Sequence, residues 1–157
     1  MRLIYTKPSL NDLSQGSRIA FVRHFRFMTQ DDVSNELGLT GECKRRSMTR
    51  YEKGDRNPKE ERTKQLANIF RISYNAIKKY DYKEPIDILY TLMWLEEIIP
   101  RYYIDLSKVP NINENNIIII KKFINEWERM RTKRLKREIS YIDYIEWKLT
   151  YEVDHYE

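Results

Sequence analysis

Apolar residues in the first part of the chain recur at helical spacing in short stretches that turn residues separate. The spacing predicts a helix over residues 18–27, capped by Ser14 or Ser17. Thr29 is a good N-cap for the next helix, and Gly38 suits a left-handed residue that ends it. The pattern therefore indicates two short helices joined by a tight turn.

Three more short helices follow. We expect the third helix over residues 44–53, with Met48 in the core and Gly54 at its end. Pro58 opens the fourth helix, and Ser73 is a candidate cap for the fifth. Five short helices in about 70 residues predict a small α-helical domain.

The second half shows a different pattern. Pro85 starts a longer amphipathic helix over residues 86–99, and residues 102–106 are a candidate short strand. The apolar run 117–120 fits either a strand or the start of the helix that follows it. Ser140 caps a last helix.

Composition limits the classes of protein that fit. Hydrophobic residues make up 41% of the 157 residues, which is enough for a core. The chain has no run of about 18 apolar residues, so we expect no transmembrane helix. The start lacks the pattern of a secretory signal, and the single cysteine, Cys43, fits a reducing compartment. We therefore expect a cytoplasmic protein.

Charge and aromatic residues are distributed unevenly. The segment from Met1 to Asp81 contains 17 Lys and Arg against 10 Asp and Glu, whereas the remainder contains 12 against 14. Ten of the 12 tyrosines and all three tryptophans follow Ser73. These differences predict two modules, a basic one at residues 9–81 and a Tyr/Trp-rich helical one at residues 82–157.

An ordered set of residues in the first module resembles the Xre/Cro family of helix-turn-helix proteins. The set consists of Gln30, Leu37-Gly38, Met48-Thr49-Arg50-Tyr51-Glu52-Lys53-Gly54, Arg56-Asn57-Pro58 and Ser73. The resemblance covers roughly residues 14–80. It implies a mainly α protein with a five-helix, lambda-repressor-like head that binds double-stranded DNA, followed by a smaller helical module with a candidate short β element.

The predicted third helix is the recognition helix of this resemblance. Helix-turn-helix proteins place the leading end of that helix in the major groove. The predicted DNA-binding set is Gln30, Lys44, Arg45, Arg46, Ser47, Thr49, Arg50, Lys53 and Arg56. A basic cluster by itself is often only a solvated face, but the surrounding five-helix pattern favours DNA.

Different members of this set are expected to do different work. Arg45 and Arg46 suit bidentate contacts with guanine, whereas Ser47 and Thr49 are less selective. Arg50, Lys53 and Arg56 suit phosphates. Gln30 resembles the family glutamine that holds a phosphate or fixes the recognition side chains, and Glu52 resembles a structural glutamate.

The turn at residues 39–44 departs from the family pattern because it is about four residues longer than usual. It contains Gly41 and Cys43. This insertion leaves open which residue caps the recognition helix, and so which side chains reach the bases.

The sequence shows no pattern typical of an enzyme. His24 and His155 belong to no metal-binding spacing, and Cys43 has no nearby histidine. We expect no catalytic residue, no metal and no cofactor. The pair Glu96-Glu97 at the end of an amphipathic helix is predicted to be solvated.

The C-terminal half offers less specific clues. Residues 129–137 hold six positive charges in nine residues, which fits either an exposed helix end or a grip on phosphates or another acidic partner. The half resembles extensions found behind Xre-type heads in Gram-positive mobile elements. Its aromatic residues suit a core and also a self-association surface.

The favoured function is a sequence-specific DNA-binding transcriptional regulator that acts as a repressor and as a homodimer. Two alternatives stay open. One is an accessory factor or antitoxin of a mobile element, and the other is a helix-turn-helix adaptor that binds proteins. The sequence identifies no small-molecule effector.

Overall fold

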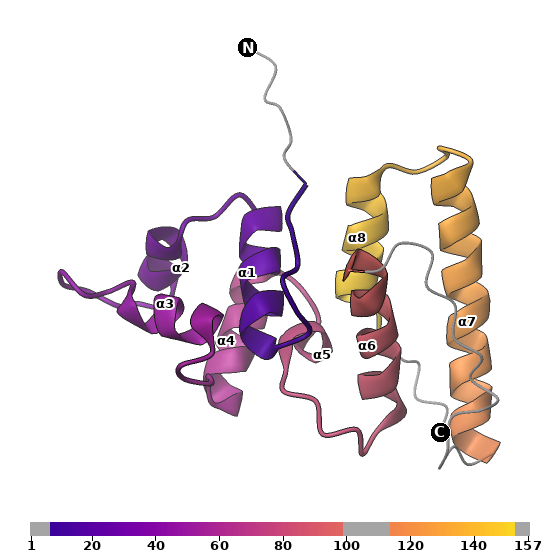
Figure 1. The fold of residues 1–157 in the computed structure, drawn as a ribbon, viewed down its shortest axis with the longest axis horizontal. Helices are drawn as coiled ribbons and strands as arrows, with labels where there is room; N and C mark the ends of the chain where they lie inside the picture. Colours follow the sequence, from indigo (N-terminus) through magenta and orange to yellow (C-terminus); the bar gives the residue numbers. More distant parts are fainter. Residues whose placement is uncertain (1–6, 99–113, 153–157) are drawn as a thin grey trace. The chain divides into compact units, whose positions relative to one another are not determined.

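The computed structural model describes residues 7–98 and 114–152, and every regular element in these two ranges is an α-helix (Figure 1). The chain divides into two compact units, Met1–Lys79 and Tyr80–Glu157. The predicted mainly α fold class is therefore confirmed. The predicted strand at 102–106 lies outside the described residues.

The first unit is built from five helices. They are α1 (Gln15–Phe25), α2 (Gln30–Glu36), α3 (Arg46–Lys53), α4 (Glu60–Phe70) and α5 (Tyr74–Ile77). The hydroxyls of Ser14, Thr29 and Ser73 cap α1, α2 and α5, as the sequence predicts. At α2 the cap is reciprocal, because Asp32 accepts from the Thr29 backbone N–H in return.

Some helix boundaries differ from the prediction. Helix α1 starts three residues earlier than expected and ends at Phe25, because Phe27 adopts a left-handed conformation with φ of 55°. Helix α4 begins at Glu60 rather than at Pro58. Both differences lie at helix ends, where the apolar spacing carries little information.

The core of the first unit gathers apolar side chains from all five helices. Its fully buried members include Ile19, Val22, Val33, Met48, Leu66, Phe70 and Ile77. Helices α1 and α3 approach so closely that a Cβ at Gly16 would collide with the carbonyl oxygens of Tyr51 and Glu52. The closeness of these two helices fixes the position of α3 against the core.

Two buried polar residues of α1 hold the end of α5. Arg18 is 2% exposed and donates to the carbonyl oxygens of Ala76 at 3.0 Å and Lys78 at 2.8 Å. Gln15 donates to the carbonyl oxygen of Ile77 at 3.0 Å. Both side chains thus satisfy carbonyl groups that a short helix leaves without intrahelical partners.

The second unit contains three helices in its described residues. They are α6 (Pro85–Ile98), α7 (Glu114–Leu135) and α8 (Tyr141–Thr150). The ambiguous run 117–120 is helical and lies in α7. Ser140 caps α8 as predicted, and the Asp143 carboxylate accepts from the Ser140 backbone N–H in return.

Aromatic rings fill the space between α7 and α8. Phe123 stands 5.6 Å from Trp127 and 5.0 Å from Tyr151, measured between ring centroids. Trp147 stacks nearly parallel to Tyr144 at 6.3 Å. The Tyr/Trp-rich composition of this half therefore builds a core, in line with the first of its two expected uses.

The pair Glu96-Glu97 corrects a prediction. These carboxylates are not solvated, because their side chains are only 15% and 6% exposed. Lys148 on α8 donates to Glu97 at 2.8 Å, and Tyr144 donates to Glu96 at 2.6 Å. Burial, followed by the nearby Glu96 charge, raises the pKa of the Tyr144 hydroxyl, so that it remains a protonated donor.

Candidate nucleic-acid interface

Helices α2 and α3 are joined by an extended turn over residues 37–45. Gly38 and Gly41 occupy left-handed conformations with φ of 75° and 93°. Backbone bonds close the turn from Lys44 N–H to the Gly41 carbonyl at 3.3 Å and from Arg46 N–H to the Cys43 carbonyl at 3.0 Å. The departure from a short turn is thus an ordered feature with its own hydrogen bonds.

The extended turn changes where the recognition helix begins. Helix α3 starts at Arg46, two residues later than predicted, and Arg45 at its N-cap makes no capping bond with its side chain. Lys44 lies in the turn and donates to the Asn35 side chain at 2.9 Å. Arg45 lies 3.7 Å from Asp31, in a pair that is mostly exposed. Both cations therefore contact side chains of α2.

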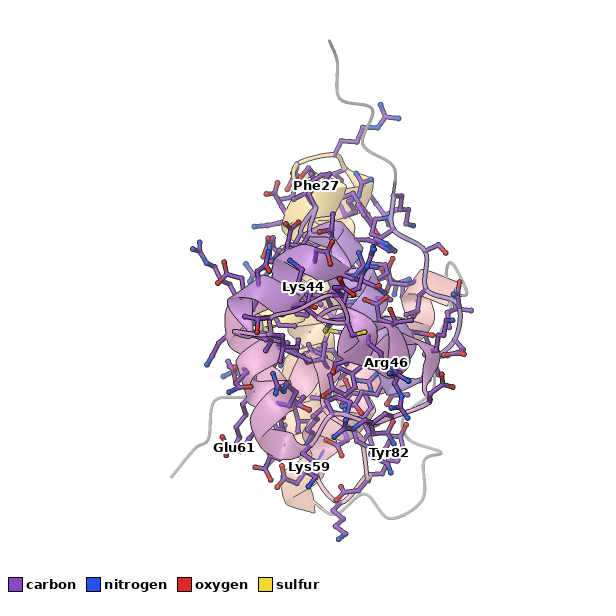
Figure 2. All side chains as sticks on the ribbon, turned by 90° about the vertical axis from the view of Figure 1, so that its left-hand side faces the viewer. Phe27, Lys44, Arg46, Lys59, Glu61 and Tyr82 are labelled. Carbon is purple, nitrogen blue, oxygen red and sulfur yellow. The ribbon has the colours of Figure 1, made fainter. Side chains whose placement is uncertain are left out.

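The cations on α3 itself follow one face of the helix. Arg46, Arg50 and Lys53 are spaced by four and three residues, and all three are exposed. The opposite face points into the core, because Met48 is fully buried and Tyr51 is 6% exposed. Figure 2 looks onto the side of the unit that carries α2 and α3, where Lys44 and Arg46 are labelled.

The rest of the predicted set is divided between exposed and half-buried positions. Arg45 and Arg56 are exposed, whereas Gln30, Lys44, Ser47 and Thr49 are half-buried. The structure thus brings the whole predicted set to α3, the turn before it, the loop after it and the start of α2.

A buried ion pair lies directly behind the recognition helix. Arg23 of α1 grips Glu52 of α3 with two bonds, from Nε at 2.5 Å and from Nη2 at 3.1 Å. The two side chains are only 10% and 11% exposed. A bidentate pair shielded from water fixes both angle and distance between the two helices.

The network continues from Glu52 to the exposed side of α3. Gln30 donates from Nε2 to Glu52 at 2.9 Å, and its Oε1 accepts from the Thr49 hydroxyl at 2.9 Å. This amide orientation is the one that satisfies both contacts, because a carboxylate only accepts and a hydroxyl can donate. Gln30 therefore contacts a recognition-helix side chain, which is one of the two roles that the resemblance implies for it.

Sequence reasoning did not identify Arg23 as a partner of Glu52. Arg26 was likewise unexpected, since it donates to the carbonyl oxygens of Phe70 at 2.7 Å and Arg71 at 3.2 Å. Together with Arg18, these residues show that the cations of α1 serve the fold. The sequence carries a signal for Arg18 and Arg26. Each lies four residues from Val22, so helical spacing puts both on the same face as this apolar residue.

Two other features are absent from the described residues. No helix there is long and apolar enough to cross a membrane. The same part of the chain holds no group of three or more His, Cys, Asp or Glu side chains that could bind a metal ion.

Comparison with known proteins identifies the first unit. Residues 16–81 match the model of a family described as a helix-turn-helix domain. No curated protein and no solved structure matches the chain. The resemblance of the C-terminal half to mobile-element extensions therefore stays a prediction. The match covers α1 to α5 and the ordered turn between α2 and α3, so residues 16–81 are a helix-turn-helix DNA-binding domain of the Xre type.

Proposed function

We propose that this protein is a sequence-specific regulator of transcription that binds double-stranded DNA through α3. The observation that supports the proposal best is the pairing of an exposed cationic face on α3 with a buried scaffold behind it. Arg46 and Arg50 are exposed on that face, and the ion pair of Glu52 anchors its other side. A side chain that contacts bases must start from a helix that is held in a fixed position.

We favour Arg46 over Arg45 as the residue that contacts the bases. Because α3 starts there, Arg46 stands at the leading end of the helix that enters the major groove. A guanidinium at that place suits the O6 and N7 atoms of guanine. Arg45 stands just before the helix and has to leave Asp31 to reach a base. Ser47 is a less selective second contact.

The remaining cations suit the DNA backbone. Arg50, Lys53 and Arg56 lie further along α3 or in the loop after it, and all are exposed. Lys44 lies half-buried in the turn before α3 and has to leave Asn35 to contact a phosphate. Contacts of this kind supply affinity and orientation, while the bases supply specificity.

We further propose that the protein acts in the cytoplasm as a homodimer, without enzymatic activity, and represses by occupying its site. A single small head rarely gives enough specific affinity. Two heads related by a twofold axis would read half-sites about 10 bp apart or a multiple of that distance. Occupancy alone blocks polymerase and requires no further contact surface.

Selection of bound duplexes from a random DNA pool tests this function. Wild type should enrich an inverted repeat, and the Lys64→Ala variant should enrich the same repeat. Lys64 is an exposed cation on α4, paired with Glu60 at 2.8 Å, so its loss controls for charge. The Arg46→Ala variant should enrich sequences with a relaxed preference at one position of each half-site.

The alternatives predict other outcomes. A helix-turn-helix adaptor that binds proteins should enrich no sequence at all from the pool. An accessory factor or antitoxin of a mobile element should enrich a site, but its deletion should alter DNA transfer or toxicity and not the transcription of the gene beside that site.

A further inference from the structure

The second half of the chain concentrates its positive charge in one short stretch. Six of the 12 Lys and Arg in residues 82–157 fall within residues 129–137, at the end of α7 and in the turn to α8. The same half of the chain contains 14 Asp and Glu. A cationic stretch thus stands on a segment that is acidic as a whole, and the proposed contacts of α3 do not involve it.

Only one of these six cations is paired with carboxylates inside the fold. Arg131 lies 3.8 Å from Glu96 of α6 and 3.3 Å from Glu128. Glu126 and Glu138, which flank the stretch, pair with none of the six. Within residues 7–98 and 114–152, the other five make no ion pair and no side-chain hydrogen bond; they are Arg129, Lys133, Arg134, Lys136 and Arg137. Their charge is therefore uncompensated in this part of the chain.

Three of the five form a cationic row, Arg129–Lys133–Lys136, along one face of α7. Their spacing of four and three residues puts them on the same face of a helix. The Lys136 N–H donates to the Thr132 carbonyl at 2.9 Å, so helical bonding continues to the last of the three. Trp127 is buried and lies two residues before Arg129, so the row faces away from the core. Figure 1 shows α6 and α8 together on one side of α7. Arg129 and Lys136 are exposed, and Lys133 is half-buried.

The end of α7 does not need these cations as caps. Its last carbonyls are bonded by backbone N–H groups, from Arg137 to Arg134 at 3.1 Å and from Glu138 to Lys133 at 2.9 Å, which is a Schellman motif. A helix dipole favours cations only within its last turn, whereas Arg129 lies more than one turn before the end of α7. Helix capping therefore does not account for the row as a whole.

Like charges this close together repel one another and lower the stability of the helix that carries them. No ion pair among the described residues offsets the repulsion between the five. An anion from outside the fold would remove it. We propose that the cationic row binds phosphates of the DNA that the first unit recognises. This inference rests on the proposed function and extends the DNA contact to the second unit.

DNA is the polyanion that the adjoining unit binds. Residues 16–81 are a helix-turn-helix DNA-binding domain, and the second unit follows directly at Tyr80. Binding by the first unit therefore raises the effective concentration of phosphates around the second. The row extends over seven residues, or about 10 Å at 1.5 Å per residue. Phosphates of one strand advance about 3.4 Å each along the duplex, so the row matches about three of them. Such contacts add affinity without sequence preference.

The test uses the Lys133→Gln/Lys136→Gln variant of the full chain, with a synthetic duplex of the selected site and a random duplex. The slope of log affinity against log salt should fall by roughly two on both duplexes, and binding at low salt should weaken roughly tenfold. The ratio of the two affinities should stay that of wild type, because phosphates carry no sequence. The variant should unfold at no lower temperature than wild type, since it removes repulsion and no contact within the described fold.

Lys83→Gln/Lys121→Gln is a matched control, because it removes the same charge from the same unit. Lys83 and Lys121 are exposed and lie outside the row. Their replacement should leave the slope and the affinity unchanged. Lys133→Arg/Lys136→Arg keeps both charges and should keep the slope of wild type. Ethylation of single phosphates should identify positions that weaken binding of wild type and no longer affect Lys133→Gln/Lys136→Gln.

Several results would overturn the inference. If Lys133→Gln/Lys136→Gln keeps the slope of wild type while Lys53→Ala reduces it, the row is not a DNA contact, although the proposed function stands. If the control variant lowers the slope equally, the effect belongs to net charge and not to the row. If Lys133→Gln/Lys136→Gln changes sedimentation from dimer to monomer, the row contacts a second copy of the chain. If wild type binds neither duplex, the proposed function and this inference fail together.

Discussion

The two units of the chain both bury charged side chains between helices, yet these buried charges connect to different elements. In the helix-turn-helix unit the pair of Arg23 and Glu52 continues through Gln30 to Thr49 on α3. The outer side of α3 presents exposed cations to solvent. The buried charges thus position a surface.

In the second unit the buried charges connect helices to one another. Lys148 of α8 contacts Glu97 at 2.8 Å and the Met93 carbonyl at 3.3 Å, both on α6. Trp127 of α7 donates to the Tyr144 hydroxyl at 2.8 Å. The difference teaches that buried charge alone does not indicate a binding site. Glu96 also lies 3.8 Å from Arg131 of α7, so the network joins all three helices of the described second unit.

Removal of Glu52 should have the largest effect. The Glu52→Ala variant leaves Arg23 buried without its partner, so we expect the free energy of unfolding to fall by about 3–5 kcal/mol. Urea unfolding measures this loss. The Glu52→Gln variant is the control, because its amide oxygen still accepts from Arg23 and the loss should be smaller. A change of only about 1 kcal/mol for Glu52→Ala would show that the pair behaves as a surface salt bridge.

Removal of a buried charge in the second unit should lower stability without changing the DNA sequence that the protein prefers. Lys148→Met keeps the length of the side chain but removes the ammonium partner of Glu97, while Glu96 keeps Arg131 at 3.8 Å, so the free energy of unfolding should fall by about 3 kcal/mol. The sequence enriched from a random DNA pool should nevertheless stay the same. An altered preference would contradict the distinction between the two networks.

Loss of a phosphate contact should have a moderate effect. Lys53→Ala should weaken binding to selected and random duplexes alike, and should reduce the slope of log affinity against log salt by roughly one. Titrations at several salt concentrations measure the slope. Lys64→Ala, a cation of α4, should leave it unchanged, and equal slopes for the two variants would remove Lys53 from the interface.

The smallest effect concerns pH. Burial and the neighbouring Arg23 guanidinium lower the pKa of His24 from its ordinary value of 6.5. The unfolded chain therefore binds this proton more readily than the folded protein, so stability is lost as pH falls through 6.5 toward the lowered value. The His24→Gln variant should lose less stability than wild type between about pH 7.5 and pH 5.5. Identical pH dependence of the two proteins would contradict the shift.

Much of the fold could be predicted because its signals are local. Thr29 and Ser140 cap helices through bonds to residues three positions away, and Gly38 and Gly54 end helices through their own backbone freedom. Caps of this kind depend on residue type and order, both of which the sequence displays. The ordered set of such signals also carried the resemblance to the helix-turn-helix family.

The start of α3 could not be predicted for a physical reason. Arg45 takes a helical conformation without a capping side chain, so no residue type marks the boundary. Lys44 and Arg45 also have good helix propensity. The residue types of the turn therefore do not distinguish it from the first turn of the helix.

The buried networks were missed because their partners are far apart in sequence. Glu97 meets Lys148 across 51 residues, and Arg23 meets Glu52 across 29. Pattern analysis assigns a charged residue at a helix end to solvent, since that is where most such residues lie. Only the packing of the helices shows which charges are enclosed.

The claim that α3 reads base pairs through Arg46 is tested most directly by one ratio of affinities. The ratio compares binding to the selected duplex with binding to random duplex at one salt concentration, for Arg46→Ala and for Lys64→Ala. Arg46→Ala should lose about 1–3 kcal/mol on the selected duplex and much less on random DNA, so its ratio should fall. Lys64→Ala should keep the ratio of wild type. Equal losses by Arg46→Ala on both duplexes would contradict base reading by this side chain.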